Sequence, residues 1–72
     1  MAITGKQKQI VEDALRCDEG ACFFSWGEDS VTAYNAIHNT IDDFMIDVDT
    51  NGNLSYTPVS NNGVTICIKQ NG

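Results

Sequence analysis

The residues of this chain whose side chains most often bind metals or act as nucleophiles are three cysteines and one histidine: Cys17, Cys22, Cys67 and His38. Structural zinc usually takes two closely spaced ligand pairs, and here Cys17 and Cys22 form the only pair, separated by four residues. The sequence has no nucleophile-elbow signature and no phosphate-binding glycine loop. We therefore expect free thiols, with Cys17 and Cys22 buried as small apolar side chains, and no metal, cofactor or enzymatic activity.

The segment Asp47–Leu54 resembles the first eight positions of the calcium-binding loop of EF-hand proteins. The family requires oxygen-bearing residues at positions one, three and five and a glycine at position six, which here are Asp47, Asp49, Asn51 and Gly52. The resemblance implies oxygen ligands for calcium. The family's twelfth position holds a bidentate glutamate, however, and this chain has Pro58 there. A hairpin turn explains the same residues better, so weak calcium binding is the least favoured function.

Acidic residues without neighbouring cations are the most unusual feature of the sequence. The net charge is −6, and no Lys or Arg lies between Cys17 and Ile68. The acidic residues of that interval are Asp18, Glu19, Glu28, Asp29, Asp42, Asp43, Asp47 and Asp49. The basic residues lie towards the two ends of the chain: Lys6, Lys8, Arg16 and Lys69. Nucleic acids and anionic membranes attract clustered basic residues, so we expect neither as a direct partner. We expect the acids to gather on one exposed surface that binds a basic partner.

Hydrophobic alternation over residues 44–69 predicts three antiparallel strands with one buried face. A two-residue turn at Asn51–Gly52 would place apolar side chains opposite polar ones. A three-residue loop that ends at Gly52 instead gives the pairs Val48–Leu54 and Ile46–Tyr56. A second loop of the same form, at 61–63, gives the pairs Pro58–Ile66 and Tyr56–Ile68.

Two helices and one strand are predicted before this meander. Thr4 and Gln7 form a capping box for a helix that ends near Gly20 and carries an ion pair between Glu12 and Arg16. Its apolar stripe consists of Ile10, Val11, Ala14 and Leu15. The segment Ala21–Trp26 is predicted as a strand. A second helix is predicted from Asp29 or Ser30 to Asp42–Asp43, with the apolar residues Val31, Tyr34, Ile37 and Ile41 on one face.

These elements predict a single small α+β domain over residues 1–72, in the order α-β-α-β-β-β. The strand–helix–strand unit is expected to be a right-handed crossover with parallel strands. The expected architecture has two layers: a four-stranded mixed sheet that contains the C-terminal antiparallel meander, and two helices on one face. Without a signal peptide or a membrane span in the sequence, we expect a cytoplasmic protein.

The sequence therefore favours a non-enzymatic acidic module that docks on a basic surface of a partner protein. In its sharper form the module is an inhibitor that masks a nucleic-acid-binding surface by presenting carboxylates in place of phosphates. Its size and charge are similar in kind to those of small phage-encoded inhibitors of host nucleic-acid enzymes, although no motif is shared. The alternative is a structural or assembly domain that forms a homodimer through a sheet edge at Val64–Lys69, aided by the outward apolar residues Met45, Val59 and Cys67.

Overall fold

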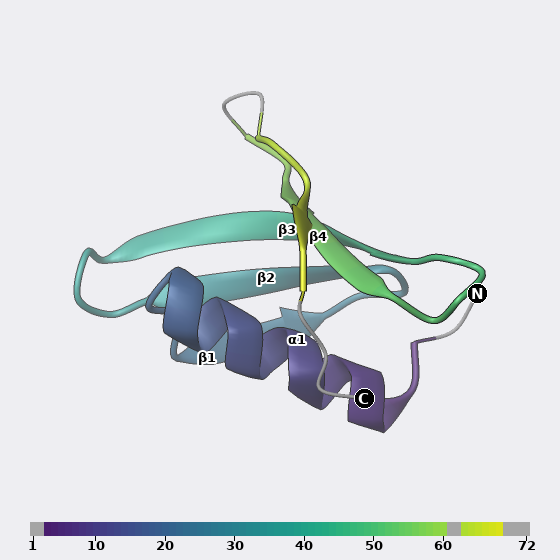
Figure 1. Ribbon diagram of the computed structural model, residues 1–72. Helices are drawn as coiled ribbons and strands as arrows, with labels where there is room; N and C mark the ends of the chain where they lie inside the picture. The colour runs from purple at the N-terminus through teal and green to yellow at the C-terminus, as the bar shows by residue number, and fades with distance from the viewer. Residues whose placement is uncertain (1–2, 61–62, 69–72) are drawn as a thin grey trace.

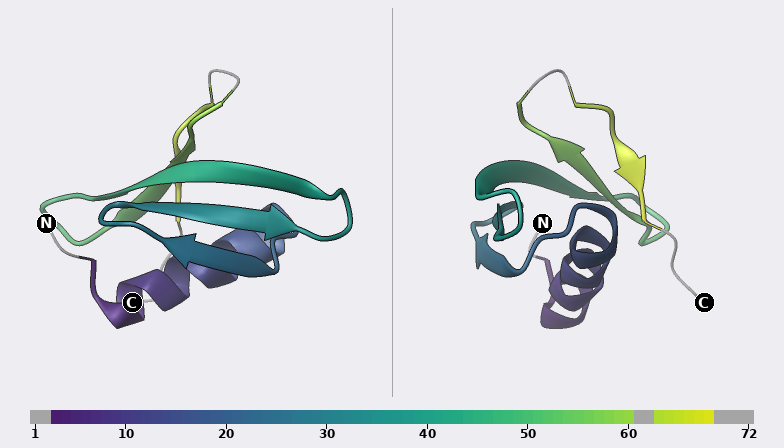
Figure 2. Two further views of the ribbon diagram at one scale, coloured as in Figure 1. Left: turned by 180° about the vertical axis from the view of Figure 1, so that it is seen from behind. Right: turned by 90° about the vertical axis from the view of Figure 1, so that its left-hand side faces the viewer.

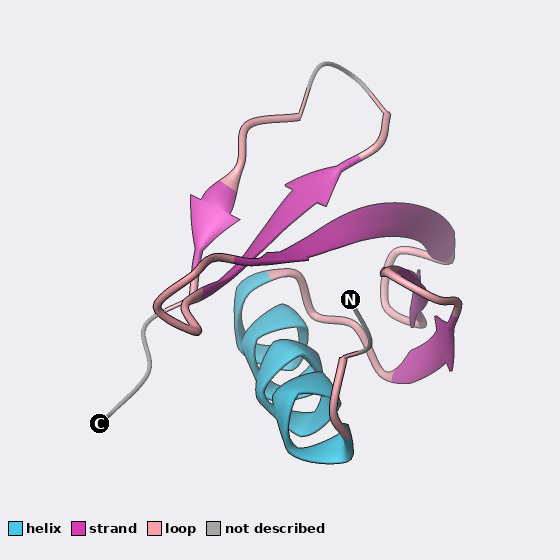
Figure 3. Cartoon of the chain, turned by 90° about the vertical axis from the view of Figure 1, so that its right-hand side faces the viewer, coloured by secondary structure: helices cyan, strands magenta, loops and turns pink. Residues whose placement is uncertain are grey.

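One helix lies against one face of a curved, five-stranded antiparallel sheet in the computed structural model, which describes residues 3–60 and 63–68 (Figure 1). The elements are α1 (Gly5–Asp18), β1 (Phe23–Trp26), β2 (Ser30–Asn35), β3 (Thr40–Val48), β4 (Leu54–Pro58) and β5 (Ile66–Cys67). The strands neighbour one another in chain order, β1-β2-β3-β4-β5. The long strand β3 curves around the helix, and the β4–β5 hairpin extends away from the rest of the sheet (Figures 2 and 3).

The helix α1 begins at the predicted capping box. The backbone N–H of Gln7 donates to Thr4 Oγ1 at 3.1 Å, and the backbone N–H of Thr4 donates to Gln7 Oε1 at 2.9 Å. The helix ends at Asp18, and Gly20 follows with a φ of +73°, a conformation that glycine adopts without a steric cost. Val11 and Leu15 are fully buried, so these two residues of the predicted stripe lie in the core.

The predicted ion pair between Glu12 and Arg16 is wrong. Glu12 Oε2 instead accepts a hydrogen bond from the indole N–H of Trp26 at 2.8 Å, because this half-buried indole requires an acceptor. Arg16 pairs with Asp13, one turn back along the helix, at 3.0 Å. The indole hydrogen bond therefore ties α1 to β1.

The predicted second helix is also wrong, because this segment forms β2, a turn over residues 36–39 and the first part of β3. In β2, the buried residues Val31, Ala33 and Asn35 alternate with half-buried ones, which is the period of a strand. Two residues of the supposed apolar helix face, Ile37 and Ile41, are 83% and 69% exposed. The segment is rich in residues that favour strands over helices, such as Val, Thr, Tyr and Ile.

The predicted architecture must be corrected accordingly. Over residues 3–60 and 63–68, the order is α-β-β-β-β-β, with one helix instead of two, and the five strands are all antiparallel instead of forming a four-stranded mixed sheet. The parallel crossover does not exist, since β2 pairs with β1 and with β3 in antiparallel registers. The class, a small α+β domain, is retained.

The β3–β4 register is confirmed and the β4–β5 register is wrong. Val48 pairs with Leu54 and Ile46 with Tyr56, around a turn in which Gly52 has a φ of +84°. In β5, however, Ile66 pairs with Tyr56 in place of the predicted Ile68. A shift of two residues leaves each side chain on its predicted face. Gly63 approaches Pro58 closely in this arrangement, since an added Cβ would stand 2.5 Å from the carbonyl oxygen of Pro58. The predicted loop at 61–63 lies partly outside the described residues.

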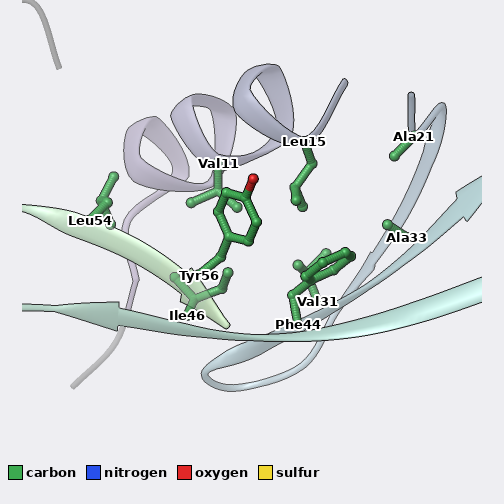
Figure 4. Close-up of a cluster of buried hydrophobic side chains, with 9 residues drawn as sticks. All are labelled: Val11, Leu15, Ala21, Val31, Ala33, Phe44, Ile46, Leu54 and Tyr56. Atoms are coloured by element: carbon green, nitrogen blue, oxygen red, sulfur yellow. The ribbon is translucent and has the colours of Figure 1, made fainter. Parts of the chain in front are cut away.

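The hydrophobic core lies between α1 and the inner face of the sheet (Figure 4). Its central ring pair is Phe44 and Tyr56, packed edge to face with centroids 5.5 Å apart. The buried apolar residues are Val11, Leu15, Ala21, Val31, Ala33, Phe44, Ile46, Leu54 and Tyr56. Because α1 covers this face alone, the other face of the sheet is exposed over β1, β2 and β3 (Figure 2, left).

Candidate functional site

The exposed sheet face, called the outer face here, carries the side chains that alternate with the core residues. From β1 to β5 these are Phe23, Ser25, Ser30, Thr32, Tyr34, Ile41, Asp43, Met45, Asp47, Ser55, Thr57 and Cys67. Most are hydroxyl-bearing or acidic, and the apolar ones concentrate at the end of the sheet where β2 turns into β3. The outer face and the turns that border it therefore provide the surface for any interaction through the sheet.

The eight acidic residues singled out in the sequence are all exposed. Within residues 3–60 and 63–68, none of them forms an ion pair, and the one salt bridge found there joins Arg16 to Asp13. Arg16 also lies over the ring of Phe24, at 5.4 Å, and Lys8 lies over Trp26, at 5.6 Å. Two of the basic residues are thus engaged with aromatic rings of β1 instead of with these carboxylates.

Three of the acids lie on neighbouring segments at one end of the sheet. The backbone N–H of Ile46 donates to the carbonyl oxygen of Asp29 at 2.9 Å, which places the β1–β2 turn beside the last part of β3. The turn that carries Glu28 and Asp29 therefore borders the part of β3 that carries Asp47. We call Glu28, Asp29 and Asp47 the sheet-end acids.

Two further acids, Asp18 and Glu19, lie at the C-terminal end of α1. Tyr56 donates its hydroxyl hydrogen to Asp18 Oδ2 at 3.2 Å, and Asn35 Nδ2 donates to the carbonyl oxygen of Glu19 at 2.7 Å. The pKa of Tyr56 is raised to about 12, mainly because the phenol is buried and secondly because the charges of Asp18 and Glu19 are nearby. Tyr56 is therefore neutral at physiological pH and acts as a hydrogen-bond donor.

Asp42 and Asp43 are adjacent in β3 but point to opposite faces of the sheet. Asp43 is opposite Thr32 on the outer face, and Thr32 Oγ1 donates to Asp43 Oδ1 at 2.6 Å. Asp42 is opposite Ala33 on the inner face. Asp47 follows Asp42 by five positions on β3, so the distance between them along the strand is about 17 Å. The acids therefore fall into separate groups and do not form the single surface expected from the sequence.

Asp49 stabilises the β3–β4 turn. Its Oδ1 accepts the backbone N–H groups of Asn51 at 2.8 Å and Asn53 at 2.9 Å, and its Oδ2 accepts from Asn53 Nδ2 at 3.1 Å. These bonds, chiefly the one from the Asn53 backbone, hold the pKa of Asp49 below its ordinary value. No group of three or more His, Cys, Asp or Glu side chains able to hold a metal occurs in the described part of the chain. The bonds of Asp49 make the segment that resembles a calcium loop an Asx-stabilised hairpin turn between β3 and β4.

Asp49 should make the stability of the protein depend on acidic pH. A carboxylate whose pKa is lower in the folded state stabilises that state above its unfolded pKa, and this contribution is lost as the pH falls through the folded value. We expect the urea midpoint of the wild type to fall below about pH 4 and that of Asp49→Asn to fall less. Asp47→Asn, which removes the same charge two residues earlier in the chain, is the matched control and should keep the wild-type pH dependence. Equal pH profiles for Asp49→Asn and the wild type would contradict the assigned role.

The cysteines and His38 belong to no group of three or more potential metal ligands in the described part of the chain. Cys17, Cys22 and Cys67 are free thiols, as predicted, but all three are exposed, so the expected burial of Cys17 and Cys22 is wrong. Cys22 Sγ donates to the carbonyl oxygen of Tyr34 at 3.4 Å. His38 is exposed in the turn that joins β2 to β3, and its backbone N–H donates to Asn35 Oδ1.

Sequence reasoning missed an apolar group at one corner of the outer face. Phe23, Tyr34 and Ile41 stand opposite one another across β1, β2 and β3, and we call them the apolar corner. The alternation of Phe23 with the half-buried Phe24 was a signal for it. The assignment of Tyr34 and Ile41 to a helix concealed their shared face.

Comparison with protein-family models, with curated proteins and with solved structures finds no match to this chain. Over the described residues, α1 is the only helix, and it is neither long nor apolar enough to cross a membrane.

Proposed function

We propose that this protein is a non-enzymatic acidic binding module that docks on a basic surface of a partner protein in the cytoplasm. The observation that carries the proposal is the exposure of eight carboxylates that form no ion pair within the described ranges. Unpaired surface charges of one sign steer association with a surface of the opposite sign and discriminate against other partners. The exposed free thiols agree with a reducing compartment.

In its sharper form, the module inhibits its partner by covering a nucleic-acid-binding surface. Asp47, at the end of β3, and Asp49, in the β3–β4 turn, are two residues apart in the chain and both are exposed, which makes this end of the sheet negative. Exposed carboxylates carry the same sign of charge as the phosphates of a nucleic acid, so this region is suited to a basic nucleic-acid-binding surface. The sheet-end acids Glu28 and Asp29 extend the same negative region beside β3.

The proposal predicts a partner interaction that depends on salt and on the sheet-end acids. The tagged protein should capture a basic protein from host lysate at about 50 mM salt and release most of it at about 500 mM, because exposed charges are screened within a few ångströms there. The triple variant Glu28→Gln/Asp29→Asn/Asp47→Asn should capture less. A short DNA duplex should displace the partner if the covered surface binds nucleic acid.

A matched control removes polar groups from the outer face without changing the net charge. The double variant Ser30→Ala/Ser55→Ala should capture the partner as well as the wild type does. Capture that is undiminished at high salt, or equal for the triple variant and the wild type, would rule out docking driven by charge.

The second candidate function is a structural domain that self-associates through a sheet edge. The observation in its favour is the exposure of Met45, Val59 and Cys67, together with the short edge strand β5. Light scattering separates the two functions. A stable dimer at micromolar concentration favours assembly, and a monomer favours docking on another protein.

A further inference from the structure

The apolar corner combines exposed aromatic surface with a fixed geometry. Phe23 and Ile41 are 68% and 69% exposed, on either side of Tyr34. The rings of Phe23 and Tyr34 lie 6.1 Å apart at an interplanar angle of 31°. The hydroxyl group of Tyr34 donates to Asn39 Oδ1 at 3.1 Å, which holds the ring over the strand. An aromatic side chain that is already oriented loses little conformational entropy when a partner covers it.

A shallow cavity of about 180 Å³ lies at this corner, lined by Phe23, Phe24, Ser25, Thr32, Tyr34 and Ile41. Pockets for drug-sized ligands are usually about 300–1,000 Å³. The cavity is therefore of a size to receive one long side chain of a partner and not a small-molecule cofactor.

A carboxylate lies at the edge of the same cavity. Asp43 follows Ile41 by two residues on the same face of β3, so the two side chains are about 7 Å apart along the strand. Thr32 Oγ1 donates to Asp43 Oδ1, which orients the carboxylate on the outer face. Among the described residues, no Lys or Arg pairs with Asp43. The apolar corner and the carboxylate of Asp43 are thus close enough for one long side chain of a partner to contact both.

We propose that the apolar corner and Asp43 bind an arginine side chain from the basic surface of the partner. The aliphatic part of the arginine packs on Phe23 and Ile41, and its guanidinium stacks on Tyr34 and bonds to Asp43. Arginine suits this arrangement better than lysine, because a planar guanidinium both stacks on aromatic rings and donates in pairs to carboxylates. This inference rests on the proposed function and identifies its central contact.

The test is a titration of the 15N-labelled protein with an oligoarginine peptide and an oligolysine peptide of equal length, followed by NMR. We expect the largest shifts at residues 23–25, 32–34 and 41–43. Binding of the arginine peptide should be about threefold tighter, as a surface cation–π contact supplies about 0.5–1 kcal/mol. Asp43→Asn should weaken arginine binding about threefold more than Asp47→Asn, the matched loss of one charge from the same face and strand.

Each other outcome overturns the inference in a distinguishable way. Equal losses for Asp43→Asn and Asp47→Asn, with no preference for arginine, mean attraction by net charge alone, which leaves the proposed function standing. Failure of both peptides to bind at low salt contradicts the proposed function as well. A dimer in light scattering that Phe23→Ser dissociates shows that a second copy of the chain covers the corner.

Discussion

Replacement of Phe44 by alanine is expected to unfold a large fraction of the protein at room temperature. Phe44 is 2% exposed and packs edge to face on Tyr56 in the middle of the core. Truncation of a buried phenylalanine costs about 3–5 kcal/mol in the free energy of unfolding. Domains are stable by only about 0.05–0.15 kcal/mol per residue, so this loss is comparable with the whole stability of a 72-residue chain. Urea titration followed by the fluorescence of Trp26, the only tryptophan, measures it.

Phe23→Ala is the matched control, because it removes the same phenyl group from the opposite face of the sheet. Phe23 is largely exposed, and substitutions at such positions usually change the free energy of unfolding by about 0.5 kcal/mol or less. Similar losses for Phe44→Ala and Phe23→Ala would contradict the assignment of inner and outer faces.

Replacement of Asn35 by alanine is expected to cost about 2 kcal/mol in the free energy of unfolding. This buried side chain joins α1 to the β2–β3 turn. Its Nδ2 donates to the carbonyl oxygen of Glu19 at 2.7 Å, and its Oδ1 accepts the backbone N–H groups of Ile37 and His38 at 2.9 and 3.1 Å. Alanine supplies none of these bonds, and the Ile37 and His38 amides should then exchange faster with solvent in hydrogen-exchange measurements.

The variant Asn35→Asp distinguishes the hydrogen bond to Glu19 from the two hydrogen bonds with the turn. A carboxylate still accepts the two turn amides but cannot donate to Glu19 at neutral pH. In this variant the backbone amides of Ile37 and His38 should stay protected from exchange. The free energy of unfolding should still fall, because the bond to the end of α1 is lost. Identical protection patterns in Asn35→Ala and Asn35→Asp would show that Asn35 does not hold the turn.

The elements that the sequence predicted correctly are those set by residues close together in the chain. The capping box of α1 depends only on residues 4–7, and the β3–β4 register depends on the alternation around Gly52. The β2 segment misled the prediction because Val31, Tyr34, Ile37 and Ile41 also fit a helical spacing. The buried positions that follow Val31 in β2 are Ala33 and Asn35, which give a weak hydrophobic signal.

The exposure of the acids was predictable from composition, but their grouping was not. The segments that carry the sheet-end acids are joined by the hydrogen bond from the Ile46 N–H to the Asp29 carbonyl, a contact that requires the β1–β2 hairpin. The same hairpin brings Phe23 opposite Tyr34. The β4–β5 register was missed because a shift of two residues leaves every side chain on the same face, so the hydrophobic pattern fits both registers.

The chain-order arrangement of the strands has a consequence for folding kinetics. Each strand pairs with the strand that precedes or follows it, across turns of a few residues, so little loop-closure entropy opposes each pairing. Sheets that depend on distant pairings fold in milliseconds to seconds, and we expect this protein to fold at the fast end of that range. During translation, each strand can join the sheet soon after it leaves the ribosome, without waiting for a distant segment.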